Sequence, residues 1–356
     1  MISHIMNPTF EHDRISRRSL LLSLPALMMA PRALLQNGSP PIRVTGINHV
    51  TLRVSDVKRS VDFYQGLFGM PVISRQGTTN ANLRIGAGPQ FLGFSAAGSE
   101  TPNINHICLG VDNFNVDRII GILGQHGITK GDSAGPMKVR VRVRGPEAGG
   151  AKEGTPELSF GDPDGIVIQL QDPRYCGGAG ALGNVCPAPE ASPKKGLLAL
   201  RDWSHCTNFV SDGARSNKFY QDLFGFDIQA YQGPGAPVMG VGPGVQFLMF
   251  AGGGGGRGDA KAAPRPPSIN HLCMSMDNFR PDAVIKALES YGIKPRGNAQ
   301  GTPGPLVHYI SMRMENRGGA KEGTPELYFT DPDGLLIQLQ DVKYCGGGGV
   351  LGDVCP

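Results

Sequence analysis

The chain contains one long segment twice, and this duplication limits its possible folds more than any other feature of the sequence. The matching segments are residues 47–70 with 203–226, and residues 151–172 with 320–341. Both later segments contain AKEGTPEL and then DPDG, which is followed by an apolar run. Because self-similarity of this kind marks copies of one structural unit, we predict two related domains, at residues 46–172 and 202–345.

The segments between and after these copies differ from them in composition. Residues 173–198 are rich in Gly, Pro and Cys and are predicted to link the two domains. Residues 346–356 form a cysteine-containing tail, and the glycine-rich residues 251–267 predict a flexible surface loop.

Each copy divides again into two modules with the same order of elements. Strand-like residues 49–54 precede Ser55, which we predict to be a helix N-cap, and an amphipathic helix that ends at Gly69. Three short strands follow, and residues 106–171 repeat this order. A βαβββ module leaves one face of its sheet to be buried, so modules must pair. We therefore predict an α+β fold in which four βαβββ modules pair into two half-open barrels.

The N-terminal segment is predicted to lie outside this fold. Arg17 and Arg18 precede a short apolar stretch that ends at Ala30, and the combination resembles a twin-arginine export signal. A permanent membrane helix is not expected, because such a helix needs about 20 apolar residues. We predict that residues 1–40 are an export signal and a disordered lead, and that the mature protein is periplasmic.

The cysteines support an oxidising compartment. Cys176 and Cys186 bracket a glycine-rich turn, and Cys345 and Cys355 bracket a turn of the same length. This spacing allows a small disulfide loop in each copy. The cysteines at positions 108, 206 and 273 lie in apolar runs and are predicted to be buried free thiols. A redox or structural protein built around the Cys loops is one alternative for the function, although the loops are expected to lie outside the barrels.

Four such modules, with His-Val at residues 49–50 and DPDG before the last strand of each copy, resemble the vicinal oxygen chelate superfamily. This superfamily contains the glyoxalase, bleomycin-resistance and extradiol-dioxygenase proteins. The resemblance implies that paired modules form a cup that holds one divalent metal ion. It also implies that the ligands come from the first strand of one module and from the first and last strands of its partner.

The resemblance assigns one set of metal ligands to each copy. These candidates are His49, His106 and Gln169 in the first copy, and His205, His271 and Gln338 in the second. Two imidazoles and one oxygen donor suit Fe(II), Mn(II) or Zn(II). The alternative is that these histidines are structural, because a duplication copies structural residues as well.

The third ligand position departs from the family pattern. Family members typically have glutamate four residues after the glycine of DPDG, where this chain has Gln169 and Gln338. A neutral amide oxygen removes one negative charge from the metal site. Other oxygen donors near these positions are Gln171, Asp172, Gln340, Asp341, Glu157 and Glu326.

Candidate catalytic residues occur only in the second copy. The extradiol subgroup has a tyrosine shortly before its DP pair, which is Tyr328 here, whereas the first copy has Ser159. The catalytic histidine of that subgroup falls near Lys321 and is absent. His308 has no counterpart in the first copy, so Tyr328 and His308 are predicted to be catalytic.

The sequence therefore predicts an exported metal-dependent enzyme of dioxygenase or glyoxalase type that acts on a small oxygenated molecule. The alternative is a binding protein of bleomycin-resistance type without metal. The net charge of +4 and the lack of a long basic run argue against nucleic-acid binding. Pairing of modules within one chain predicts a monomer or a homodimer.

Overall fold

The computed structural model describes residues 39–252, 266–298 and 301–356. The predicted export signal and most of the predicted loop 251–267 lie outside these ranges.

Each copy is built from short helices and nine strands. The first copy consists of β1 (Val44–Val54), α2 (Val57–Phe68), β2 (Val72–Gln76), β3 (Asn80–Arg84), β4 (Phe91–Ala96), β5 (Asn103–Val111), α3 (Val116–Gln125), β6 (Thr129–Lys130), β7 (Lys138–Arg144), β8 (Thr155–Gly161) and β9 (Val167–Gln171). The second copy consists of β10 (Asp202–Val210), α4 (Gly213–Phe224), β11 (Ile228–Tyr231), β12 (Pro237–Gly240), β13 (Phe247–Gly252), β14 (Ser268–Met276), α5 (Pro281–Ser290), β15 (Lys294–Pro295), β16 (Val307–Arg313), β17 (Thr324–Thr330) and β18 (Leu336–Asp341).

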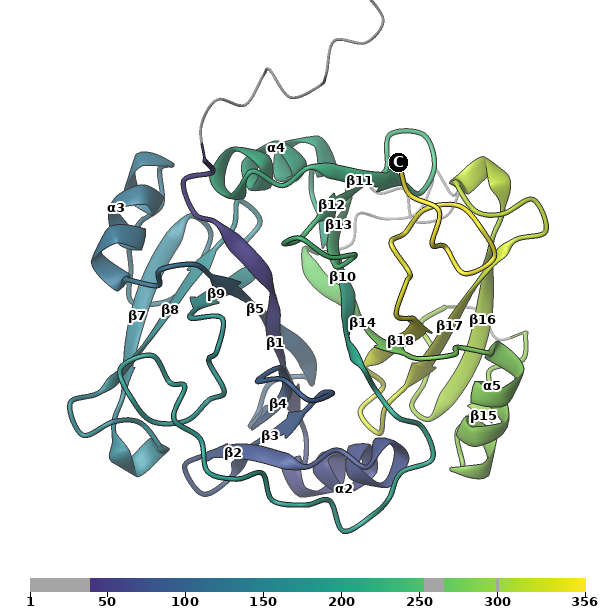
Figure 1. The fold of residues 1–356 in the computed structure, drawn as a ribbon, viewed down its shortest axis with the longest axis horizontal. Coiled ribbons are helices and arrows are strands. Elements are labelled where there is room, and N and C mark those ends of the chain that lie inside the picture. Colours follow the sequence, from purple (N-terminus) through teal and green to yellow (C-terminus); the bar gives the residue numbers. More distant parts are fainter. Residues whose placement is uncertain (1–38, 253–265, 299–300) are drawn as a thin grey trace, which may run out of the picture. The chain divides into compact units, whose positions relative to one another are not determined.

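The two modules of each copy join into one nine-stranded sheet. The order is β2-β3-β4-β1-β5-β9-β8-β7-β6 in the first copy, and the second copy repeats it as β11-β12-β13-β10-β14-β18-β17-β16-β15. The modules meet where β1 pairs antiparallel with β5, and β10 with β14. The two sheets stand side by side in Figure 1. The predicted α+β fold with paired βαβββ modules is confirmed.

The helix that follows the first strand has the same termini in both copies. The Asp56 carboxylate accepts a hydrogen bond from Arg59 N at 3.0 Å, and Gly69 ends α2 in the left-handed region at φ 67°. Asp212 and Gly225 do the same for α4. The N-cap is therefore Asp56, and the prediction of Ser55 was wrong by one residue.

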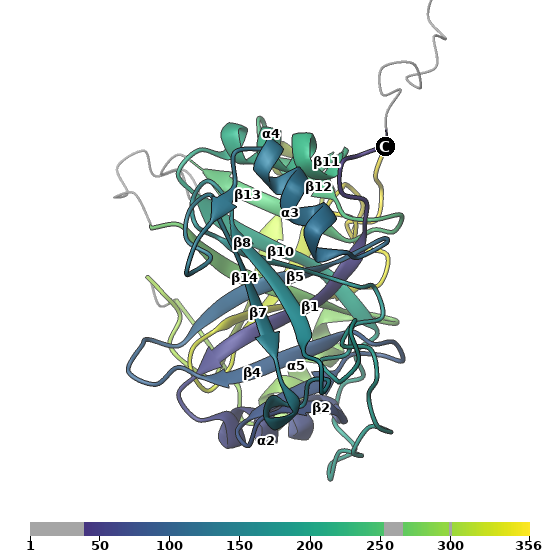
Figure 2. The same ribbon diagram turned by 90° about the vertical axis from the view of Figure 1, so that its left-hand side faces the viewer.

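Ser55 instead takes part in a contact between the two copies. Ser55 Oγ donates to Asp333 Oδ1 at 2.5 Å, and Arg59 Nη2 donates to the same oxygen at 2.6 Å. The symmetric contact joins Ser211 and Arg215 to Asp164. Each DPDG turn thus holds the first helix of the other copy, and Figures 1 and 2 show α2 and α4 at opposite ends of the paired sheets.

Aromatic side chains bury the same interface. The Phe63 and Phe68 rings of α2 lie 6.4 Å and 6.1 Å from that of Phe329 on β17. In the symmetric arrangement, Phe219 and Phe224 of α4 face Phe160 on β8. The repeated Phe-Tyr helix residues are core residues, as predicted, and this core extends across both copies.

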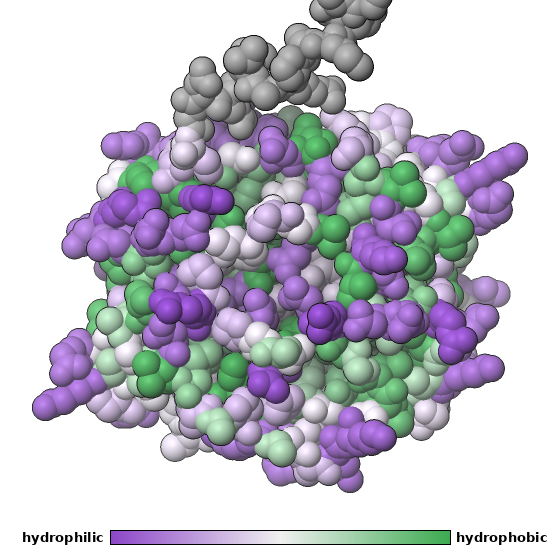
Figure 3. Space-filling view, in the orientation of Figure 1, coloured by the Kyte–Doolittle hydropathy of each residue, from purple (hydrophilic) through white to green (hydrophobic). Residues whose placement is uncertain are grey.

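Both disulfides that the cysteine spacing allows are present, between Cys176 and Cys186 and between Cys345 and Cys355. The other cysteines of the chain are buried free thiols, as predicted. Within the described ranges, every helix is too short or too polar to cross a bilayer. On the face shown in Figure 3, hydrophilic and hydrophobic residues are interspersed over both copies.

Candidate functional site

The sheet register brings the three predicted ligands of the first copy together. Cys108 on β5 pairs with His49 on β1 and also with Gln169 on β9, so these two side chains lie level across the sheet. His106 precedes Cys108 by two residues and therefore faces the same side. The Nε2 atoms of His49 and His106 are 3.3 Å apart. We call this group, with the side chains around it, the first cup.

The second copy repeats this geometry. Cys273 on β14 pairs with His205 and with Gln338. His205 Nε2 lies 3.4 Å from His271 Nε2 and 3.1 Å from Gln338 Oε1. We call this group and its neighbours the second cup. All six predicted ligands thus form two groups of three.

Asparagine side chains fix both imidazoles of the first cup. Asn48 Oδ1 lies 2.8 Å from His49 Nδ1, and Asn105 Oδ1 lies 2.8 Å from His106 Nδ1. Asn48 Nδ2 donates to the carbonyl oxygen of Tyr175 at 2.9 Å, which leaves Oδ1 to accept from the imidazole. With protons on both Nδ1 atoms, both Nε2 lone pairs point into the cup.

The second cup has only one such asparagine. Asn270 Oδ1 lies 2.8 Å from His271 Nδ1, but the partner of His205 Nδ1 is Ser204 Oγ, at 3.1 Å. A serine hydroxyl donates or accepts, so it does not fix the tautomer of His205. His205 is therefore able to carry its proton on Nε2, facing Gln338 Oε1.

Burial favours the neutral form of three imidazoles, those of His49, His106 and His205. It lowers the pKa of His49 well below its usual value; the charge of His106 adds to this effect, and a hydrogen bond to Gln169 opposes it. Burial lowers the pKa of His106 to about 4, against an opposing effect of Glu157. Burial, aided by His271, also lowers the pKa of His205 well below its usual value. Neutral imidazoles are the form that binds metal ions.

These donors fit a divalent cation. Two nitrogen lone pairs 3.3 Å apart repel each other unless a cation lies between them. The amide oxygen of Gln169 supplies a third donor next to them, while Nε2 of Gln169 and of Gln338 is buried without a hydrogen-bond partner among the described residues. Within that part of the chain, no three His, Cys, Asp or Glu side chains gather as metal ligands. The glutamine is therefore the third donor that the geometry offers.

The other oxygen donors that the sequence suggested fall into two groups. Gln171 Nε2 donates to the Pro156 carbonyl oxygen at 3.2 Å, and Gln340 does the same to Pro325, while Oε1 of both glutamines is buried without a hydrogen-bond partner among the described residues. Asp172 and Asp341 accept hydrogen bonds from backbone amides of the turns that follow them.

Glu157 and Glu326 face the cups, but buried arginines hold them. Arg144 Nε donates to Glu157 Oε1 at 2.8 Å, and Tyr175 donates to the same oxygen at 2.7 Å. Arg313 contacts Glu326 in the same way at 2.8 Å. Each glutamate therefore serves as the anchor of a buried arginine beside its cup.

The two candidate catalytic residues lie on opposite faces of the second sheet. The Tyr328 ring is 5.3 Å from that of His271, so Tyr328 belongs to the second cup. The buried His308 lies 3.3 Å from Glu289 of α5, on the helix-covered face. The structure therefore does not bring His308 to the cup.

A cavity of about 480 Å³ opens from the first cup. Its walls include the polar side chains of Arg53, Asn82 and Arg142. Tyr175 also lines it and lies 5.5 Å, ring to ring, from His49. Tyr175 belongs to the predicted linker and directly precedes the Cys176–Cys186 loop, so this linker forms part of the site.

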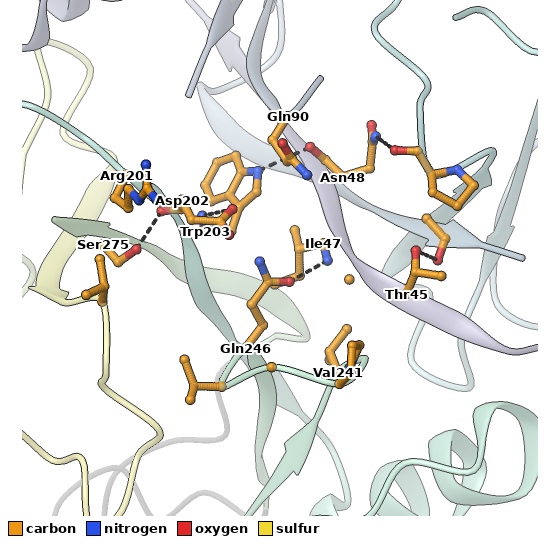
Figure 4. Close-up of a pocket in the computed structure, with 17 residues that line it drawn as sticks. Thr45, Ile47, Asn48, Gln90, Arg201, Asp202, Trp203, Val241, Gln246 and Ser275 are labelled. Atoms are coloured by element: carbon orange, nitrogen blue, oxygen red, sulfur yellow. Dashed lines mark hydrogen bonds between the residues drawn. The ribbon is translucent and has the colours of Figure 1, made fainter. Parts of the chain in front are cut away.

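A second cavity, of about 440 Å³, lies between the two copies (Figure 4). Trp203 Nε1 donates to the Asn48 carbonyl oxygen at 3.2 Å, and Gln246 Oε1 accepts from Ile47 N at 2.7 Å. Residues of the second copy thus fix the strand that carries His49.

Sequence reasoning missed the residues that orient the histidines. The signal was available, because Asn directly precedes His49, His106 and His271, whereas Ser precedes His205. The roles of Tyr175 and Tyr344 had no signal of their own, because both follow the last strand of their copies and only the fold returns them to the cups.

Comparison with known proteins identifies the class to which this fold and site belong. Residues 46–170 match the Glyoxalase/Bleomycin resistance protein/Dioxygenase superfamily, and residues 205–242 match the bleomycin resistance protein-like N-terminal family. The chain is 30% identical over 141 residues to lactoylglutathione lyase of Escherichia coli O157:H7, which is 38% of this chain and 97% of that protein. The chain belongs to the glyoxalase/bleomycin resistance protein/dioxygenase superfamily.

Other relatives show the same likeness. Lactoylglutathione lyase of Neisseria meningitidis serogroup A is 30% identical over 128 residues, which is 34% of this chain and 86% of that protein. Two solved structures share the fold over most of the chain. The Mn(II)-bound glyoxalase from Novosphingobium aromaticivorans has a TM-score of 0.57 at 18% identity, covering 84% of this chain and 82% of that one. Homoprotocatechuate 2,3-dioxygenase from Brevibacterium fuscum has a TM-score of 0.57 at 19% identity, covering 85% and 82%.

Proposed function

We propose that the protein is a metal-dependent enzyme of the vicinal oxygen chelate type. The observation that carries this proposal is the pair of facing Nε2 atoms in the first cup, whose lone pairs the two asparagines direct at each other. The names of the relatives, a lyase and a ring-cleaving dioxygenase, support a small oxygenated substrate.

His49, His106 and Gln169 would hold one divalent ion, and His205, His271 and Gln338 a second. Fe(II), Mn(II) and Zn(II) suit this nitrogen and oxygen donor set. When bound, such an ion polarises two adjacent oxygens of a substrate as a Lewis acid.

The chain's own residues orient the site. Asn48 and Asn105 hold the imidazole rings through their Nδ1 atoms. The Phe91 ring stacks on His49 at 4.3 Å, so β4 supplies an apolar wall at this level of the sheet. In the second cup, the Tyr328 hydroxyl lies 3.5 Å from Glu326 Oε2, and in this proposal it would hold or release a proton beside His271.

The test is the metal content per chain, measured by plasma mass spectrometry on protein purified anaerobically without chelators. We expect close to stoichiometric metal in the wild type and in His126→Ala, a control outside the cups. We expect none in the double variant His49→Ala, His205→Ala. Oxygen uptake with catechols and turnover of lactoylglutathione would then separate the two reaction types. Absence of metal from the wild type after incubation with each ion would refute the proposal.

A second candidate is a binding protein without metal. The match of residues 205–242 to the bleomycin resistance protein-like family favours this function for the second copy, and Ser204 allows His205 a metal-free tautomer. Under this candidate, small-molecule binding would survive the double histidine variant.

We also propose that residues 1–40 direct export. The two disulfides support this assignment, because such bonds persist in oxidising compartments. Replacing Arg17 and Arg18 by Lys should keep the protein in the cytoplasm, which cell fractionation would measure. Unchanged periplasmic recovery would contradict the assignment.

A further inference from the structure

The strand next to the outermost strand of each sheet, β7 or β16, differs in charge between the two copies. Alternate residues of β7 face the first cup, since Arg142 and Arg144 both reach Glu157. The residues on this face are Lys138, Arg140, Arg142 and Arg144. The equivalent residues of β16 are Val307, Tyr309, Ser311 and Arg313. Only the arginine that anchors the glutamate occurs in both strands.

Arg142 carries a charge that the first cup does not fully neutralise. Its Nε lies 3.3 Å from Glu157 Oε2, while Arg144 already contacts Oε1 of the same carboxylate. Two guanidinium groups therefore share one carboxylate. The Arg142 side chain is 48% exposed and lines the cavity, so a ligand can reach it.

Arg53 adds a second cation to the same cavity. It projects from β1 and forms an ion pair with Glu100, whose side chain is 60% exposed. Exposed ion pairs of this kind contribute little free energy, so a ligand can replace Glu100 at low cost. Three arginines thus face two glutamates, and one positive charge remains in excess.

The second cup has neither of these cavity-lining cations. Phe209 occupies the position of Arg53, and Ser311 that of Arg142. Tyr309 stacks on Tyr328 at 5.2 Å, which makes this wall aromatic. The one arginine on β16, Arg313, is matched by Glu326 at 2.8 Å, and the Arg296 guanidinium lies over the Tyr309 ring at 5.2 Å.

We propose that the first cup selects a small organic anion, whose carboxylate or phosphate group binds Arg142 and Arg53, and that the second cup does not select for charge. This inference rests on the proposed function only in that it treats the cups as ligand sites. Guanidinium groups bind planar oxyanions through two parallel hydrogen bonds, which suits this role better than a single ammonium would.

The test compares ligands that differ only in charge. Isothermal titration would use 3,4-dihydroxybenzoate, its uncharged amide and the matching arylphosphonate, with both chelator-treated and metal-loaded protein. We expect one tight site per chain for an anion. We also expect at least about tenfold weaker binding of the amide to that site, as loss of a charge-assisted contact predicts. The benzoate and phosphonate arms distinguish a carboxylate ligand from a phosphate-like one.

Variants exchange the residues of the two cups. Arg142→Ser with Arg53→Phe should weaken anion binding by about tenfold to a hundredfold and leave amide binding within about twofold. The control is Arg140→Tyr, which removes a charge from the same strand face outside the cavity lining and should have a small effect. The reciprocal change, Ser311→Arg with Phe209→Arg, should create a second anion site. Circular dichroism would check that each variant is folded.

The outcomes separate this inference from the proposed function. An anion preference in chelator-treated protein that disappears in Arg142→Ser with Arg53→Phe supports the inference even if no metal ever binds. Equal affinities for benzoate and amide, or an anion preference that survives the double variant, would overturn it even if both cups hold metal.

Discussion

The two cups share their three central side chains but differ in the residues next to them. Both place two imidazoles and one glutamine on adjacent strands in the same register. Around this group, Asn48 becomes Ser204, Arg53 becomes Phe209 and Arg142 becomes Ser311. The sheet thus maintains the position of the donors, while tautomer, charge and ligand contacts vary with single side chains.

The contacts between the copies show the opposite behaviour. Arg59 binds Asp333, and Arg215 binds Asp164, with nearly equal distances of 2.6 Å and 2.8 Å. This interface is symmetric because each copy supplies one helix and one turn to the other. Because the two copies pack against each other, both retain the residues of this interface, whereas the residues around each cup can change independently.

The largest expected difference between the copies is in the free energy of unfolding that is lost when the buried arginine beside each cup is replaced. Glu326 has one arginine partner, whereas Glu157 has two. Arg313→Met would leave Glu326 as an unpaired buried charge and should lower the free energy of unfolding by about 3–5 kcal/mol. Arg144→Met should cost less, about 1–3 kcal/mol, because Arg142 remains beside Glu157. Urea denaturation of both variants would measure this, and equal losses would contradict the assigned charge balance.

The tautomer difference predicts unequal metal affinity. Asn48→Ser gives the first cup the arrangement of the second and should weaken its metal binding by about 10–100-fold, as loss of a residue that orients a ligand typically does. Ser204→Asn should strengthen binding in the second cup. Competition with a fluorescent chelator would measure both constants.

Asn105→Ser is the matched control for this comparison, because it changes the other asparagine of the same cup and should weaken binding similarly. If Asn48→Ser leaves the affinity unchanged while Asn105→Ser lowers it, the tautomer of His49 does not determine the difference between the cups.

Replacing the glutamine of each cup should change the metal affinity by a smaller amount, and by the same amount in both cups. Gln169→Glu would supply the negative charge that the amide lacks and should tighten divalent metal binding by about tenfold, and Gln338→Glu should do the same. His49 and His106 stay in place, so the number of sites should not change. A weaker site in Gln169→Glu would show that this side chain is not a metal ligand.

Much of this architecture could be predicted from the sequence. The duplication and the period of the apolar residues indicated the four modules. These features are local, so the spacing along the chain is enough to find them. The candidates His49, His106 and Gln169 came from the resemblance to the vicinal oxygen chelate superfamily, whose motif positions they match.

The features that escaped prediction depend on distant contacts. Tyr175 reaches the cup only because the linker folds back over the sheet. His308, predicted to be catalytic, lies on the helix-covered face, which the sequence of β16 alone could not reveal. The role of Asp333 depends on the other copy, which a reading of one repeat at a time cannot supply.

The smallest predicted effect tests whether the two halves of the interface between the copies, which have the same geometry, also contribute equally to stability. Burial raises the pKa of Asp162 and of Asp331 to about 6, and each carboxylate lies 3.3 Å from a tyrosine hydroxyl of the other copy, Tyr220 or Tyr64. In the unfolded chain the pKa is about 3.9, so the folded state binds more protons between pH 4 and pH 6. The contribution of each carboxyl group to the free energy of unfolding should therefore rise by about 1 kcal/mol as the pH falls from 7 to 5.

Asp162→Asn and Asp331→Asn keep the oxygen that accepts from the turn amides. Each should remove the same share of this pH dependence in urea denaturation, and a much larger loss in one variant would show that the two halves of the interface are not equivalent.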